Sequence, residues 1–227
     1  MKVGSVENLV ERLDDEVSWR KREISEIALT VEILRSPEAR GAVLRAGLAL
    51  LYAHFEGYVR ESIYLYLSFV TTTRTPVAAL SHQVAPFFLR SFRFEATRSG
   101  HDLNIGEFVA LVRGDQGGTK RLSVRREDVD TQSNLNWKRL LRLLSAAGLD
   151  TGSLPDYEGI VDEALLARRN GIAHGQWEGV SLDEYTAVRD AVLKLMDAIT
   201  TCIVNAAASQ SFKREGGELR VPDLGSV

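Results

Sequence analysis

An arginine and a histidine, Arg169 and His174, lie five positions apart near the end of a predicted helix, and Asn170 directly follows the arginine. A guanidinium can neutralise a phosphate, and an imidazole can move protons near pH 7. These residue types at this spacing therefore suit chemistry on a phosphodiester. A structural interpretation fits as well, because basic residues and a glycine are common where a helix ends.

The composition is that of a soluble globular protein. The 227 residues are 44% hydrophobic and 26% charged, a length that fits one domain or at most two. The net charge of −3 argues against a generally basic nucleic-acid coat but allows a local binding site. Cys202 is the only cysteine, which excludes an intramolecular disulfide and fits a reducing cytoplasm. We expect no signal peptide and no membrane span, because the longest apolar run, residues 46–55, is too short.

Apolar residues recur every three or four positions along four long segments, as in amphipathic helices. The first segment runs from Ser5 to Leu34. Ser36-Pro37 starts the second, which runs to about Val70 and is the most apolar. The third runs from about Asp156 to Asn170, and a capping-box sequence at Ser181–Glu184 opens the last.

The segment from residue 90 to residue 142 is weakly patterned and basic. Its eleven basic and seven acidic residues give a net charge of +4. Such asymmetry is typical of a nucleic-acid contact, although a solvated loop with an accidental excess fits equally well. We predict short helices after Thr75-Pro76, at 105–112 and at Trp137–Ala147, and a strand or extended arm at Arg121–Val129.

His54 and Glu56 lie inside the apolar second helix. Buried polar groups are normally paired, so a satisfied core contact is the favoured interpretation and a supporting role at a site is the alternative. The histidines at 54, 82 and 101 fall in different elements, and no Cys-x-x-Cys or His-x-x-x-His occurs. We therefore predict no metal site.

Three stretches occur together along the chain: Leu-Leu-Tyr-Ala-His-Phe-Glu-Gly at 50–57, Thr-Gln-Ser-Asn-Leu at 131–135, and Ala-Arg-Arg-Asn-Gly-Ile-Ala-His-Gly at 167–175. Together they resemble the MAE-type nucleases of the HEPN superfamily, with the RiboL-PSP-associated HEPN group as near kin. The third stretch carries the superfamily signature of an arginine followed shortly by a histidine. Gly171 replaces a frequent alanine and leaves both signature residues in place.

The resemblance implies an all-α fold, a HEPN-type bundle of four long helices with short extra helices and a basic loop insert. We expect one domain over 1–212, with the 90–142 insert inside it, and a tail at 213–227. The implied activity is that of a metal-independent endoribonuclease without a cofactor, a cytoplasmic homodimer from a toxin–antitoxin or phage-defence system. Its partners would be RNA and a cognate antitoxin or regulatory protein, with no membrane. The alternatives are a non-catalytic HEPN module that binds RNA, a nucleotide or a protein, and a purely structural helical dimer.

Metal-independent RNA cleavage needs a base for the 2′-hydroxyl, positive charge for the transition state and an acid for the leaving oxygen. Arg169 would bind the phosphate, His174 would be the acid or base, and Asn170 would orient one of them. One copy cannot readily fill all three roles, whereas two copies across a two-fold axis can. The remaining expected site residues are Arg121, Arg125, Arg126 and Arg168 for substrate binding, with His54 and Glu56 in support.

The spacing also makes a geometric demand. Five positions along an unbroken helix turn a side chain by about 140°. We therefore expect the helix to break or tighten near Gly171, or Arg169 and His174 to converge through the dimer.

Overall fold

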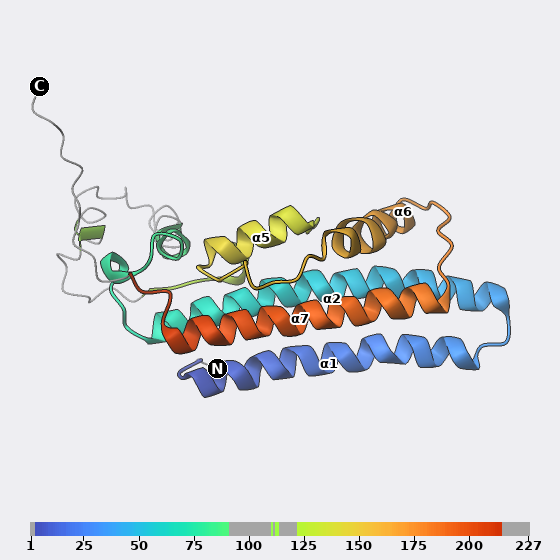
Figure 1. Ribbon diagram of the computed structural model, residues 1–227, viewed down its shortest axis with the longest axis horizontal. Helices are drawn as coiled ribbons and strands as arrows, with labels where there is room; N and C mark the ends of the chain where they lie inside the picture. The colour runs from blue at the N-terminus through green and yellow to red at the C-terminus, as the bar shows by residue number, and fades with distance from the viewer. Residues whose placement is uncertain (1–2, 91–109, 111, 114–121, 215–227) are drawn as a thin grey trace, which may run out of the picture.

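Three long helices form the body of the molecule. The structure is a computed structural model that describes residues 3–90, 110, 112–113 and 122–214. The helices are α1 (Val6–Ile33), α2 (Pro37–Thr72) and α7 (Leu182–Ser209). Each of the three packs against the other two, and they run side by side along the long axis (Figure 1). The predicted all-α class is confirmed: the described part has no β-strand, only an isolated bridge between Leu80 and Lys213.

Each long helix begins at a serine that the sequence marks as a start signal. The hydroxyls of Ser5, Ser36 and Ser181 accept hydrogen bonds from backbone N–H groups in the first turn. Glu184 completes the capping box by accepting from the Ser181 N–H at 2.8 Å. A cap of this kind stabilises a helix by about 1 kcal/mol, which explains why these starts could be predicted locally.

The bundle is tightest where α2 carries Gly47. A Cβ atom at Gly47 would lie 2.5 Å from Ile27 of α1 and 3.3 Å from the Tyr185 ring of α7. The Tyr185 hydroxyl donates to the carbonyl of Ile24 on α1 at 3.2 Å. The missing side chain at Gly47 therefore lets three helices meet at one level, with α2 in the centre.

Shorter elements cover the side of α2 and α7 that faces away from α1 (Figure 1). They are α5 (Trp137–Ala146), η3 (Gly159–Ala167) and α6 (Arg168–Ala173). The element η3 is a π-helix that continues directly into α6. Together they are the predicted fourth helix, which starts and ends later than expected and is much shorter than the other three.

The remaining predicted elements are small. The helix expected after Thr75-Pro76 is a single 3-10 turn, η1 (Val77–Ala79). Residues 122–125 form neither helix nor strand, Arg125 is extended, and the 3-10 turn η2 (Arg126–Asp128) follows, as expected for an arm rather than a strand. Residues 91–109, 111 and 114–121 of the basic insert lie outside the described residues, as does the tail from 215 onward. Of the helix predicted at 105–112, only residues 110 and 112 are described, and both are helical.

Helix α7 is long and apolar enough to cross a membrane by length and composition alone, with a mean hydropathy of 1.5 in its most apolar window. The sequence argument considered only residues 46–55 and did not foresee this. In the structure the apolar stripe of α7 packs into the bundle, including the predicted core residue Cys202. The composition of α7 is therefore accounted for by its place in the core.

His54 belongs to the α1–α2 contact. It is 5% exposed, its Nε2 lies 2.9 Å from Oε2 of Glu23, and its ring meets the edge of the Trp19 ring at 5.1 Å. Burial lowers the pKa of His54, and Glu23 offsets this only in part. The carboxylate of Glu23 is half exposed, so water screens its charge. The partner of His54 is thus Glu23, not Glu56.

This environment makes stability depend on pH. Because the folded pKa of His54 is lowered, the unfolded chain binds a proton first as the pH falls, and stability decreases below the ordinary pKa of histidine, about 6.5. We expect the free energy of unfolding, measured in urea, to decrease between pH 7 and pH 5.5. His54→Gln should flatten this decrease, and the matched change at exposed His82, His82→Gln, should not. Equal slopes in the two variants would contradict the assignment.

Candidate functional site

Helix α6 carries Arg169 and Asn170, and His174 forms its C-cap. The helix remains α-helical through Gly171 and ends at Ala173. The expected break near Gly171 is therefore wrong. Glycine costs only about 1 kcal/mol inside a helix, which the surrounding structure easily offsets.

Gly175, directly after the His174 cap, terminates the helix in a Schellman motif. Gly175 has a left-handed φ of +75°. Its N–H donates to the carbonyl of Ile172 at 3.1 Å, and the N–H of Gln176 donates to the carbonyl of Gly171 at 2.9 Å. This pair of bonds satisfies carbonyls that the helix end would leave free. The structural interpretation of the segment is confirmed, and it leaves the side chain of His174 exposed.

Four groups surround the guanidinium of Arg169. Nη1 donates to Oδ1 of Asn170 at 2.8 Å, and Nη2 donates to the carbonyl of Ser133 at 3.1 Å. The group stacks on the Tyr52 ring at 4.0 Å, and Nη2 lies 3.8 Å from Oε2 of Glu56. A guanidinium carries five N–H donors, so donors remain for an anion. The side chain of Arg169 is 23% exposed, which gives such an anion access.

The segment Thr131–Leu135 is tied to α2 at two points. The Thr131 hydroxyl donates to Oε1 of Glu56 at 2.5 Å, and the Leu135 N–H donates to the Tyr52 hydroxyl at 2.6 Å. Burial raises the pKa of Tyr52 to about 12, so the phenol stays neutral at pH 7. Tyr52 therefore fixes the loop through its hydroxyl and supports Arg169 through its ring.

The same segment has an unusual backbone. Gln132 and Ser133 both have left-handed φ angles, +55° and +54°. Such angles are uncommon for residues other than glycine and persist only where surrounding contacts fix them. Asn170 supplies one such contact, because its Nδ2 donates to Oδ1 of Asn134 at 3.3 Å. The strained turn aims the Ser133 carbonyl at Arg169.

The three stretches that carry the resemblance thus meet at one place. Tyr52 and Glu56 come from the first, Ser133 from the second and Arg169 from the third. None of these contacts follows from helical periodicity, because they join parts of the chain far apart in sequence. Sequence reasoning missed the roles of Tyr52 and Ser133, although both lie inside the stretches that it selected.

Arg169 and His174 do not contact each other within one copy, in the part of the chain that the structure describes. In the part of the chain described here they share no hydrogen bond, and the regular α6 turns their side chains well apart. Since the helix does not break near Gly171, the convergence of Arg169 and His174 through a second copy stays a prediction.

The other predicted site residues are distributed around this centre. Arg125 bonds to Asp128 within η2, and Arg126 pairs with Glu61 of α2 at 2.7 Å. Arg168 donates to the carbonyl of Gly179 and lies 3.8 Å from Glu178. Arg121 lies outside the described residues. The structure brings Glu56 to Arg169 but places His54 in a separate contact with Glu23.

Comparison with known families decides the ancestry. The model of the MAE_28990-like HEPN family matches residues 9–212. The chain belongs to the HEPN superfamily. No curated protein and no solved structure matches the chain. HEPN domains are often ribonucleases, so membership indicates a nuclease-like or RNA-related role.

The HEPN signature residues should differ in their structural importance. Arg169→Ala removes a hydrogen bond to the 131–135 loop and the stacking on Tyr52, so we expect the free energy of unfolding to fall by about 1–2 kcal/mol. His174→Ala removes only an exposed side chain and should change it by less than about 0.5 kcal/mol. Urea titration of both variants measures the difference. Similar losses in the two variants would argue against the contacts described for Arg169.

Proposed function

We propose that this HEPN protein is a metal-independent endoribonuclease that acts as a cytoplasmic homodimer in toxin–antitoxin or phage defence, with a cognate antitoxin or regulatory protein as partner. The observation that carries the proposal is the position and exposure of the two signature residues. A fixed, partly accessible guanidinium at Arg169 lies on the same short helix as an exposed imidazole at His174.

The reaction needs no metal if these groups fill the required roles. A base removes the proton of the 2′-hydroxyl, whose oxygen attacks the adjacent phosphorus. The 5′-oxygen leaves with the electron pair of its bond and takes a proton from an acid, which gives a 2′,3′-cyclic phosphate and a 5′-hydroxyl. Arg169 stabilises the charge on the phosphorus oxygens, and its contact with Asn170 keeps the fork oriented. His174 is the acid or the base.

A second copy completes the site. One motif offers a single imidazole, while the reaction uses both an acid and a base. Trp177, just after His174, is 81% exposed, and large exposed aromatic side chains often mark contact surfaces. The apolar composition of α2 and α7 gives this interface less support. The large apolar side chains described on those two helices are buried or half-buried.

One observation favours the second candidate, a non-catalytic HEPN module that binds RNA, a nucleotide or a partner protein. Arg169 hydrogen-bonds to the Ser133 carbonyl and lies near the carboxylate of Glu56. These contacts join α6 to the 131–135 loop and to α2, so Arg169 stabilises the fold whether or not it acts in catalysis. RNA binding without cleavage by the unaltered protein, together with lower stability of Arg169→Ala, would favour this module.

Product analysis tests the chemistry. We expect purified protein to cut mixed RNA in EDTA, to leave 2′,3′-cyclic phosphate ends, and to spare DNA, which lacks the attacking hydroxyl. His174→Ala should lower the rate by at least about 100-fold, the contribution typical of a general acid or base. Arg169→Lys, which keeps the charge but loses the planar fork, should also be strongly impaired.

The matched control for His174 is His82→Ala, at another exposed histidine outside the site. It should cut RNA at the rate of the unaltered protein. A strict requirement for a divalent ion, or full activity in His174→Ala, would remove this mechanism.

A mixed dimer tests the shared site. If both copies of His174 serve one cleft, a heterodimer of one unaltered and one His174→Ala protomer should keep far less than half of the activity. The two protomers carry different affinity tags, so the heterodimer can be purified, and one with His82→Ala serves as the control. Half activity would indicate independent sites, and a scattering mass equal to a monomer in an active preparation would exclude the dimer.

A further inference from the structure

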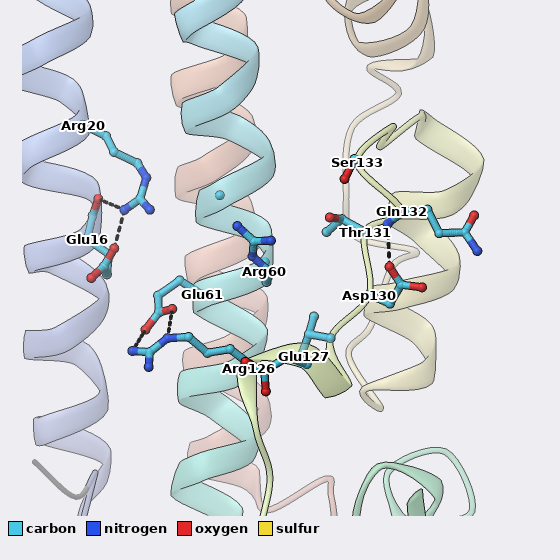
Figure 2. A pocket seen from close by; sticks show the side chains of 12 residues that line it. Glu16, Arg20, Arg60, Glu61, Arg126, Glu127, Asp130, Thr131, Gln132 and Ser133 are labelled. Atoms are coloured by element: carbon cyan, nitrogen blue, oxygen red, sulfur yellow. Dashed lines mark hydrogen bonds and ion pairs between the residues drawn. The ribbon is translucent and has the colours of Figure 1, made fainter. Parts of the chain in front are cut away.

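A polar groove of about 620 Å³ borders the candidate site. It lies between α1, α2 and the segment from Arg126 to Ser133 (Figure 2). Its wall includes Thr131, which bonds to Glu56, and Ser133, whose carbonyl holds Arg169. The groove and the candidate site therefore share the strained 131–135 loop.

Helix α2 joins the two regions as well. Tyr52, Glu56 and Arg60 are spaced by four residues and so lie along one face of the helix. The first two contact the Arg169 region, and Arg60 lines the groove. Four residues correspond to about 6 Å along the helix axis. A strand bound at Arg169 would therefore reach the groove within about one nucleotide.

Three arginines line the groove, and one of them has its charge available. Arg20 pairs with Glu16, and Arg126 pairs with Glu61 through two hydrogen bonds of 2.7 and 2.8 Å (Figure 2). Arg60 is exposed and forms no ion pair or hydrogen bond with any residue that the structure describes. The two pairs have no net charge, and Asp130 of the lining lies 3.8 Å from Arg139. Arg60 therefore supplies a cation that an anionic ligand can use, with the exposed carboxylate of Glu127 as the remaining charge of the lining.

Arg20 is the most buried of the three arginines. Its side chain is 7% exposed and lines the groove, and its Nε has no hydrogen-bond partner among the described residues. The guanidinium stacks on the Trp19 ring at 4.4 Å, which holds it in place. The Nε atom is itself buried from solvent, so Arg20 shapes the wall of the groove while Glu16 compensates its charge.

Gly57 keeps the groove open. A glycine inside a helix costs about 1 kcal/mol relative to alanine. Packing does not require it here, because a Cβ at Gly57 would meet only Nη2 of Arg20, at an ordinary distance of 3.6 Å. A longer side chain at this position would extend into the groove that Gly57 lines. The open groove therefore explains why a glycine is present here although it lowers the stability of the helix.

We propose that this groove binds the nucleotide of the RNA strand next to the cleaved phosphate. Arg60 holds its phosphate, and the polar wall from Asp130 to Ser133 faces its ribose and base. The volume falls within the range of about 300–1,000 Å³ that is typical of small-molecule sites. The inference rests on the proposed function, because it takes RNA as the substrate.

Binding to an RNA that cannot be cut separates the groove from the chemistry. A short, fluorescent RNA with 2′-fluoro groups lacks the attacking hydroxyl, and its affinity for the full-length protein is read by anisotropy. We expect Gly57→Leu and Arg60→Ala each to weaken binding by about tenfold or more, equivalent to about 1.4 kcal/mol. Gly41→Leu, in the same helix beside a flexible arginine, and Arg22→Ala, on the surface of α1, are the matched controls. They should bind within about twofold of the unaltered protein, because neither residue lines the groove.

Arg60→Ala changes an exposed residue and keeps the test valid if Gly57→Leu does not fold. Unchanged RNA affinity in Arg60→Ala would overturn the proposal. A free nucleoside monophosphate that binds in the groove without displacing the RNA would also overturn it, because the groove would then serve a separate small molecule. Groove-dependent RNA binding without cleavage in any buffer would support the groove and count against the proposed nuclease alone.

Discussion

The organisation of this protein depends on one guanidinium. Arg169 bonds to the carbonyl of Ser133, stacks on Tyr52 and lies near the carboxylate of Glu56. Helix α6, the 131–135 loop and the centre of α2 are thereby joined at one point. Few other side chains could make these contacts, because they require a planar cation with several donors on a long stem. Lysine would keep the charge but lose the fork and much of the stacking.

This arrangement places two demands on the same side chain. In the proposed nuclease, the contacts of Arg169 would reduce the conformational entropy that it loses when a phosphate binds, which favours affinity. The nearby Glu56 compensates part of its charge, which weakens the attraction for that phosphate. Since the guanidinium is only partly exposed, the compensation is stronger than it would be in bulk water. The position of Glu56 therefore balances stability in the free protein against binding strength.

Features set by neighbouring residues were predictable from the sequence. The serine caps, the end of α5 near Gly148 and the apolar stripe of α7 all rest on local signals. Contacts between distant segments were not, and so Glu23 was missed as the partner of His54. The resemblance selected the right stretches, but only the folded chain shows how Ser133 meets Arg169. The break expected near Gly171 came from the spacing of Arg169 and His174, whereas the left-handed angle that ends the helix occurs at Gly175.

The π-helix η3 immediately before the motif gives the site a dependence on chain length. A π-helix takes up more residues per turn than an α-helix, so η3 sets the rotational phase at which α6 begins. Each residue of an α-helix corresponds to about 100° of rotation. Removing one residue from Gly159–Ala167 would therefore be absorbed by a return towards α winding, whereas inserting one would turn Arg169 away from Tyr52 and Ser133. The spacing between Tyr157 and Arg169 is therefore as much a determinant of the site as the residues that form it.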